Sequence, residues 1–207
     1  MSGDLDVLET FEHANRTIKI VRDPEPPSPL EYDNYTKILC RRDLTVDLGD
    51  VQSSDALLNR EDVVDRLAEL GEHVAAILPV YGVELQRGLW SVSTEERSNA
   101  RRRIGWAYVT AELAVEMGSG QESVETFERY IREDVKTYDD YLSGDCYGYL
   151  VEGRDGDVLE SCWGFYGDLE YVRSEARAAA ENVDDPTIER AAEELAGRAT
   201  YAGPVSP

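Results

Sequence analysis

The side chains with the clearest chemical potential are carboxylates grouped where a predicted helix ends. Asp139 and Asp140 stand between Tyr138 and Tyr141, and Asp145 follows shortly after. A helix dipole disfavours negative charge at the carboxyl end of a helix, so a cation or a backbone donor there would be favourable. These three aspartates are therefore weak candidates for a metal site, and a solvated acidic helix end is the better explanation of them.

A second pair of carboxylates lies in a loop that prolines stiffen. Residues 22–34 contain four prolines, and Glu31 and Asp33 occupy the end of this stretch. Long ordered loops carry function more often than packing, so Glu31 and Asp33 are candidates for a binding surface. Turn and capping roles for Asp33 and Asn34 would account for the same residues without any ligand.

The standard catalytic motifs are missing from the sequence. It contains no Gly-x-Ser-x-Gly string, phosphate-binding glycine loop, dinucleotide glycine pattern or His-Glu-x-x-His zinc motif. Only His13 and His73 could act as a histidine base, and His73 is the better placed, at the start of an apolar run. We therefore expect no cofactor, name no catalytic residue, and favour a non-enzymatic protein.

The cysteines favour free thiols over a zinc site. They are Cys40, Cys146 and Cys162, an odd number without a Cys-x-x-Cys pair. With so few histidines to complete a ligand set, a structural zinc is disfavoured. We expect buried, unpaired thiols.

Aromatic residues concentrate in and around a predicted β-hairpin between residues 138 and 171. The hairpin runs from 146–152 to 158–166 around Asp155-Gly156, a pair typical of a tight turn. Its register predicts Leu150 opposite Ser161 and Tyr149 opposite Cys162. Simple alternation predicts one face with the set Cys146, Leu150, Leu159, Trp163 and Phe165, and the other with the set Tyr147, Tyr149, Val151, Val158 and Cys162.

Three tyrosines of this segment are candidates for a protein-binding surface: Tyr147, Tyr149 and Tyr166. Tyrosine gives a large contact area at low entropic cost and is enriched in interfaces. Trp163 and Phe165 are more typical of a core.

The charge balance restricts the possible partners. The chain has 43 acidic and 21 basic residues and a formal net charge of −22. Such a surface repels nucleic acids and anionic lipids, so we expect neither as a direct partner. Because only Lys19, Lys37 and Lys136 are lysines, adaptation to a high-salt cytoplasm explains the acidity better than mimicry of a nucleic acid, although mimicry stays open.

The elements that must position these residues predict an α+β fold. The strands are expected at 17–21, 35–41, 74–81, 85–93 and 104–109 and in the hairpin, with 74–81 as the central strand. Helices are expected at 59–70, 110–117, 123–141, 169–182 and 186–197. We predict one compact domain, with an antiparallel or mixed sheet that helices cover.

The domain organisation follows from these elements. It comprises a flexible N-terminal segment at 1–16, the α+β core at 17–167, C-terminal helices at 168–199 and a tail at 200–207. No apolar run is long enough to span a membrane, and the start of the chain has no leader pattern. The expected location is the cytoplasm.

Several short strings in the core carry a resemblance to a known family. They are Ile18-Lys19-Ile20, Ser28-Pro29-x-Glu31-x-Asp33-Asn34, Ile77-Leu78-Pro79-Val80-Tyr81, Tyr108-Val109-Thr110, Tyr138-Asp139-x-Tyr141-Leu142-Ser143-Gly144-Asp145-x-Tyr147-Gly148-Tyr149 and Ser161-Cys162-Trp163-Gly164-Phe165-Tyr166-Gly167. Over about residues 17–167 the chain resembles a family of small uncharacterised proteins encoded by bacteriophages, archaeal viruses and integrated mobile elements. The resemblance implies a genomic context, and it implies no catalytic residues because the family has no assigned activity.

The resulting hypothesis is an accessory protein of a halophilic virus or mobile element that binds a protein, with a nucleic-acid-acting host defence system as one possible target. The alternative is a small metal- or carboxylate-dependent hydrolase that uses Glu31, Asp33 and the aspartates at 139–145. A third possibility is a virion or scaffold component.

Overall fold

The computed structural model describes residues 5–32, 34–44, 48–86, 88–96, 102–116, 118 and 122–184. The described chain contains helices and two β-sheets, which confirms the predicted α+β class. It divides into two compact units, where the sequence suggested one compact domain. Unit 1 combines the two ends of the chain, residues 1–26 and 146–207, whereas unit 2 is the continuous stretch of residues 27–145.

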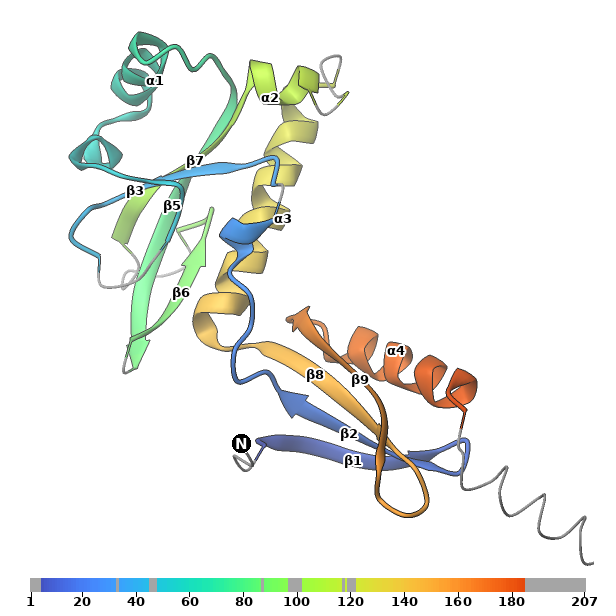
Figure 1. The fold of residues 1–207 in the computed structure, drawn as a ribbon. Helices are drawn as coiled ribbons and strands as arrows, with labels where there is room; N and C mark the ends of the chain where they lie inside the picture. Colours follow the sequence, from blue (N-terminus) through green and yellow to red (C-terminus); the bar gives the residue numbers. More distant parts are fainter. Residues whose placement is uncertain are drawn as a thin grey trace, which may run out of the picture. The chain divides into compact units, whose positions relative to one another are not determined.

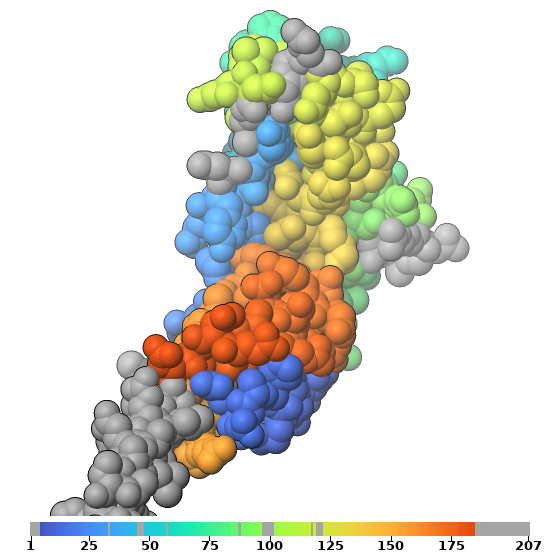
Figure 2. All heavy atoms as spheres, turned by 90° about the vertical axis from the view of Figure 1, so that its right-hand side faces the viewer, coloured from blue at the N-terminus to red at the C-terminus, as the bar shows by residue number. Residues whose placement is uncertain are grey.

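Unit 1 is a four-stranded antiparallel sheet with one helix across a face (Figure 1). Its elements are β1 (Val7–His13), β2 (Arg16–Arg22), β8 (Cys146–Glu152), β9 (Val158–Tyr166) and α4 (Leu169–Asn182), and the strand order is β1-β2-β8-β9. Figure 2 shows the outer side of α4 in orange to red beside the blue residues of the N-terminal strands. The small residues Ala176 and Ala180 are fully buried, so α4 approaches the sheet closely.

The N-terminal segment differs from the prediction, because much of it is the ordered edge strand β1. Phe11 of β1 lies opposite Ile18 of β2. Ala14 and Asn15 both adopt positive φ, at 51° and 61°, as a two-residue turn of type I′ requires. Ala-Asn is a weaker turn signal than Asn-Gly, and β1 alternates less clearly than a half-buried strand should, so the sequence pattern missed the hairpin.

The second hairpin has the predicted register, but its predicted faces are only partly correct. Leu150 lies opposite Ser161, and Tyr149 lies opposite Cys162. The register shifts between Tyr147 and Tyr149, close to Gly164, which has φ of 82°. A bulge inserts one extra residue into a strand. Phe165 therefore shares a face with Tyr149 instead of Trp163, and the two rings lie 5.8 Å apart.

Unit 2 contains a five-stranded mixed sheet. Its elements are the short helices η1 (Pro29–Glu31) and η2 (Ser54–Leu57), the helices α1 (Arg60–Glu69), α2 (Ala111–Glu116) and α3 (Val124–Ser143), and the strands β3 (Lys37–Cys40), β4 (Val51–Gln52), β5 (Val74–Gln86), β6 (Leu89–Ser93) and β7 (Arg102–Thr110). The strand order is β4-β3-β7-β5-β6, and β3 and β4 are parallel. The centre of the sheet is β7, with the predicted central strand 74–81 lying next to it inside β5.

Both faces of this sheet are covered. The apolar stripe of α3, formed by Phe127, Ile131, Val135 and Tyr138, packs on one face. Residues of α1 and η2 pack against Trp106 and Tyr108 on the other face. This two-sided burial explains why β7 is apolar from Ile104 to Val109.

The helix boundaries follow the predicted capping residues. Asn59 accepts a hydrogen bond from the Asp62 backbone N–H at 3.0 Å, and Ser123 accepts one from Thr126 at 3.4 Å. Gly144 ends α3 with φ of 79°. The predicted second C-terminal helix at 186–197 and the tail at 200–207 lie outside the described residues. Among the helices of the described chain, none has the length and apolar character that a membrane span requires.

Candidate binding surface

The burial of Tyr147 and Tyr149 contradicts their proposed surface role. Each side chain is only 5% exposed and belongs to the core that α4 closes, together with Val172 and Ala176. Burial, with Cys162 and Glu160 nearby, raises the pKa of Tyr149 to about 12. The sequence indicated covered faces, but it did not show that α4 covers the face that holds these two tyrosines. Tyr166 is half-buried at the end of β9, opposite Cys146.

The exposed part of the hairpin is its second strand. Val158 is 54% exposed and Trp163 is 38% exposed, and Cys162 between them is also exposed. Glu160 is the one charged residue of β9. Since β9 ends the sheet order, β8 is its only strand neighbour in the described part of the chain. We call Val158, Cys162 and Trp163 the β9 edge surface.

Trp163 is held in place by a glycine. An added Cβ on Gly148 would lie 2.3 Å from Cε3 of Trp163 and 2.8 Å from the carbonyl oxygen of Cys162. Only hydrogen at this position leaves room for the indole ring over β8. The close contact presents the ring at the sheet edge and limits its motion.

An aromatic series joins this edge strand to α4. The Tyr149 and Phe165 rings are 5.8 Å apart, and Phe165 contacts Tyr171 of α4 edge-on at 5.9 Å. Tyr171 is 54% exposed. The sequence analysis did not select Tyr171, since its position on an exposed helix face becomes clear only once the buried side of α4 is known.

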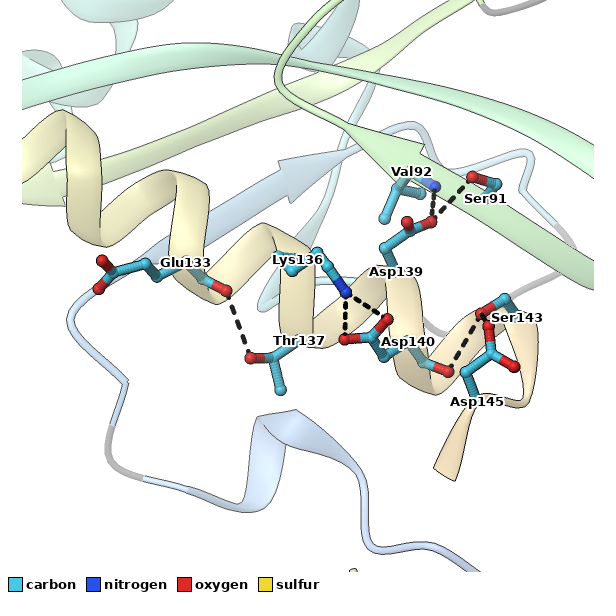
Figure 3. Close-up of polar contacts among 9 residues, drawn as sticks. All are labelled: Ser91, Val92, Glu133, Lys136, Thr137, Asp139, Asp140, Ser143 and Asp145. Carbon is cyan, nitrogen blue, oxygen red and sulfur yellow. Dashed lines mark hydrogen bonds and ion pairs between the residues drawn. The ribbon is translucent and has the colours of Figure 1, made fainter. Parts of the chain in front are cut away.

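The candidate metal-binding aspartates do not converge on one point (Figure 3). Oδ1 of Asp139 accepts hydrogen bonds from the Ser91 hydroxyl and the Val92 backbone N–H, both at 2.8 Å, and so ties α3 to β6. Within the described chain, no group of three or more His, Cys, Asp or Glu side chains is arranged to hold a metal ion.

The neighbouring carboxylates have their own partners. Both oxygens of Asp140 lie 2.6 Å from Lys136 Nζ, and Asp145 accepts from the Ser143 hydroxyl at 3.1 Å (Figure 3). Burial raises the pKa of Asp140 despite the nearby lysine. These contacts give the acidic segment a structural role at the end of α3.

The proline-rich loop is ordered by local hydrogen bonds. Ser28 caps η1 by accepting from the Leu30 backbone N–H at 3.3 Å, and the Asn34 side chain donates to the Pro29 carbonyl at 2.6 Å. Glu31 is exposed, and Asp33 lies outside the described residues. The structure therefore does not bring Glu31 together with the aspartates at 139–145 in any described contact.

The remaining candidates also have simple roles. Nδ1 of His73 lies 2.7 Å from Glu112 Oε1, and both side chains are more than half exposed, as in an ordinary surface pair. Cys40 and Cys146 are buried, as predicted, whereas Cys162 is exposed.

The sequence analysis missed one partly buried polar network. The Tyr108 hydroxyl donates to Glu72 at 2.6 Å, and Lys37 Nζ lies 2.7 Å from the other oxygen of Glu72. Burial alone would raise the pKa of Glu72, but the bonds from Lys37 and Tyr108 lower it by more. The same burial and bond raise the pKa of Tyr108. Lys37 and Tyr108 are direct cross-strand neighbours, which only the order of the strands reveals.

The fold and this surface define an α+β protein with an exposed, sparsely charged sheet edge in unit 1. No protein-family model, curated protein or solved structure matches the chain.

Proposed function

We propose that the chain is a non-enzymatic binding protein that receives an extended segment of a partner protein along β9. The observation that carries this proposal is the single charged residue in the nine-residue edge strand of a chain with a net charge of −22. Natural proteins usually protect a sheet edge with charges, prolines or a covering element. In the described part of the chain, β9 carries one charge, no proline and no further strand beside it, and its pairing with β8 shifts register near Gly164 and next to Val158. Such an edge is a surface on which a partner strand can add.

The chemistry of the edge specifies the partner segment. The backbone of β9 offers a row of donors and acceptors, which gives affinity with little sequence preference. Val158 and Trp163 offer apolar contacts for alternate side chains of an added strand. Because the protein is strongly acidic, the best partner is an apolar strand flanked by Lys or Arg.

The wider context rests on the charge and on the resemblance described above. We place the protein in the cytoplasm of a salt-adapted host, as an accessory factor of a virus or mobile element. A target within a nucleic-acid-acting defence system agrees with an acidic surface, since such systems present basic surfaces. A virion or scaffold role would instead produce self-assembly at high salt.

A pull-down at multimolar salt tests the proposal. Wild-type protein is compared with Val158→Lys/Cys162→Lys, which adds the protecting charges that β9 does not have. The matched control is Val115→Lys in unit 2, because Val115 is 68% exposed and lies on α2. We expect one stoichiometric protein that the control retains and the double variant loses. A partner that both variants retain, or no partner for the wild type, would refute the proposal.

A further inference from the structure

Arginines gather at one end of the sheet in unit 2. Arg41 and Arg42 directly follow β3, and Arg102 begins β7. The two strands are antiparallel, with Cys40 opposite Gly105, and the Arg41 backbone N–H donates to the Ile104 carbonyl at 3.0 Å. Because β3 ends where β7 begins, these three basic residues lie at the same end of the sheet.

The two strands approach unusually closely at this end. An added Cβ on Gly105 would lie only 2.2 Å from the Leu39 carbonyl oxygen. Glycine at this position lets β3 and β7 remain in register up to the arginines. The neighbouring Arg103 turns away, and its guanidinium lies 4.9 Å from the centre of the Trp106 ring.

A pocket of about 450 Å³ opens at this end of the sheet. Arg41 and Arg102 line it together with Trp90, Ile104 and Glu84. A second hollow of about 240 Å³ shares Arg41 and adds Arg42, Ser53 and Ser54. Pockets of the first size accommodate small ligands and typically combine apolar walls with a few polar groups.

The charges in this place contrast with the rest of the chain. Acidic residues outnumber basic ones by 43 to 21 overall, whereas in the lining of the two hollows the basic Arg41, Arg42 and Arg102 outnumber the acidic Asp43 and Glu84. Arg42 and Arg102 form no ion pair with any residue that the structure describes. Arg41 is held by both oxygens of Asp43. Within the described part of the chain, two guanidinium groups therefore have no acidic partner, and a third is held in position by Asp43.

Trp90, which lines the same pocket, has a buried polar atom without a partner in the described part of the chain. Its indole N–H is buried without a hydrogen-bond partner among the described residues. A buried donor without a partner costs about 1–3 kcal/mol, so native structures usually provide one. Because this nitrogen has almost no exposed surface, an acceptor atom of a ligand would reach it only after a shift of the Trp90 ring.

We propose that this arginine pocket binds a small phosphorylated molecule of about mononucleotide size. Arginine recognises phosphate through paired, charge-assisted hydrogen bonds. Trp90 and Ile104 provide apolar wall for the body of the ligand, and Glu84 accepts a hydrogen bond from a ligand hydroxyl or amine. The site lies in unit 2 and is independent of the β9 edge surface in unit 1.

Isothermal titration calorimetry with adenosine monophosphate, adenosine and inorganic phosphate tests the proposal. We expect adenosine monophosphate to bind at least about tenfold more tightly than either fragment. Adenosine has no phosphate for the arginines, and inorganic phosphate has no nucleoside to contact the apolar wall. Quenching of Trp90 fluorescence in a Trp106→Phe/Trp163→Phe background gives a second readout. No binding of adenosine monophosphate at millimolar concentration, or equal binding of adenosine, overturns the proposal.

Charge variants locate the site. Arg42→Gln/Arg102→Gln should weaken binding about tenfold or more, since each lost charge-assisted bond is worth that much. Asp43→Asn should strengthen binding because it releases Arg41. The control for the arginine variant is Arg129→Gln/Arg132→Gln on the exposed side of α3, which also removes two positive charges. The control for Asp43→Asn is Asp155→Asn in the turn of unit 1, which also removes one negative charge. Equal effects of the controls would assign the binding to overall charge and refute the pocket.

Discussion

Gly148→Ala is the substitution whose effect the structure defines most sharply. The new Cβ would lie 2.3 Å from a ring carbon of Trp163 and 2.8 Å from the Cys162 carbonyl oxygen. Both distances are far below an ordinary contact, so the ring must leave and the two strands must separate slightly. Overpacking of this kind costs typically about 1–3 kcal/mol.

The loss of stability can be worked out from the apolar contact that the Trp163 ring gives up. Trp163 is 38% exposed, so it can swing outward, but it then gives up its contact with β8. If this uncovers roughly 100 Å² of apolar surface, the loss is about 2.5 kcal/mol at 25 cal/mol per Å². With a urea dependence of about 2 kcal/mol per molar, the unfolding midpoint should fall by about 1 M.

Urea unfolding followed by tryptophan fluorescence measures this change. Trp163 reports on unit 1 in a Trp90→Phe/Trp106→Phe background, because the other two tryptophans lie in unit 2. Gly156→Ala is the control: it has φ of 86° and open space around the added Cβ, so it reports backbone strain without a clash. If Gly148→Ala is no less stable than this control, the argument that the glycine seats the indole ring is refuted.

Three further predictions concern single contacts. Asp139→Ala should lower the free energy of unfolding by about 1–3 kcal/mol, because the Val92 N–H loses its acceptor. Chemical denaturation measures this change, with Ser143→Ala as the control. The pKa of Glu72 is lowered in the folded state, so its contribution is complete above its ordinary value of 4.5 and is lost as the pH falls through the lowered value. Glu72→Gln should therefore flatten the acid side of the stability profile, and an unchanged profile would contradict this. Ala14→Gly should raise the stability by about 0.5–1 kcal/mol by removing left-handed strain at φ of 51°, which a thermal melt would show.

The sequence predicted those parts of the fold that depend on local chemistry. The capping roles of Asn59 and Ser123 are set by neighbouring residues, and both are confirmed. The predicted pairs Leu150–Ser161 and Tyr149–Cys162 are also confirmed, although the register shifts beside the turn, where Glu152 lies opposite Val158. The face of Phe165 could not be predicted, because a bulge near Gly164 depends on how Trp163 meets the opposite strand.

The candidate site was less predictable than the fold. Exposure of Tyr147 depends on which face α4 covers, and the convergence of Arg41 with Arg102 depends on the pairing of β3 with β7. Both are consequences of tertiary arrangement between segments far apart in the chain. A pattern of apolar residues identifies a strand, but it does not identify the neighbours of that strand.

The composition of unit 1 from both ends of the chain determines when it can fold. During synthesis, β1 and β2 leave the ribosome before unit 2, and β8 can pair with β2 only after all of unit 2 has been made. Until then Ile18 and Ile20, both fully buried in the finished protein, have no β8 or α4 to cover them. Unit 2 is continuous and can complete its own sheet during this interval. While unit 2 is being synthesised, the hairpin of β1 and β2 is therefore an incomplete sheet with exposed apolar side chains, and chaperone binding or misassembly of the nascent chain should concentrate there.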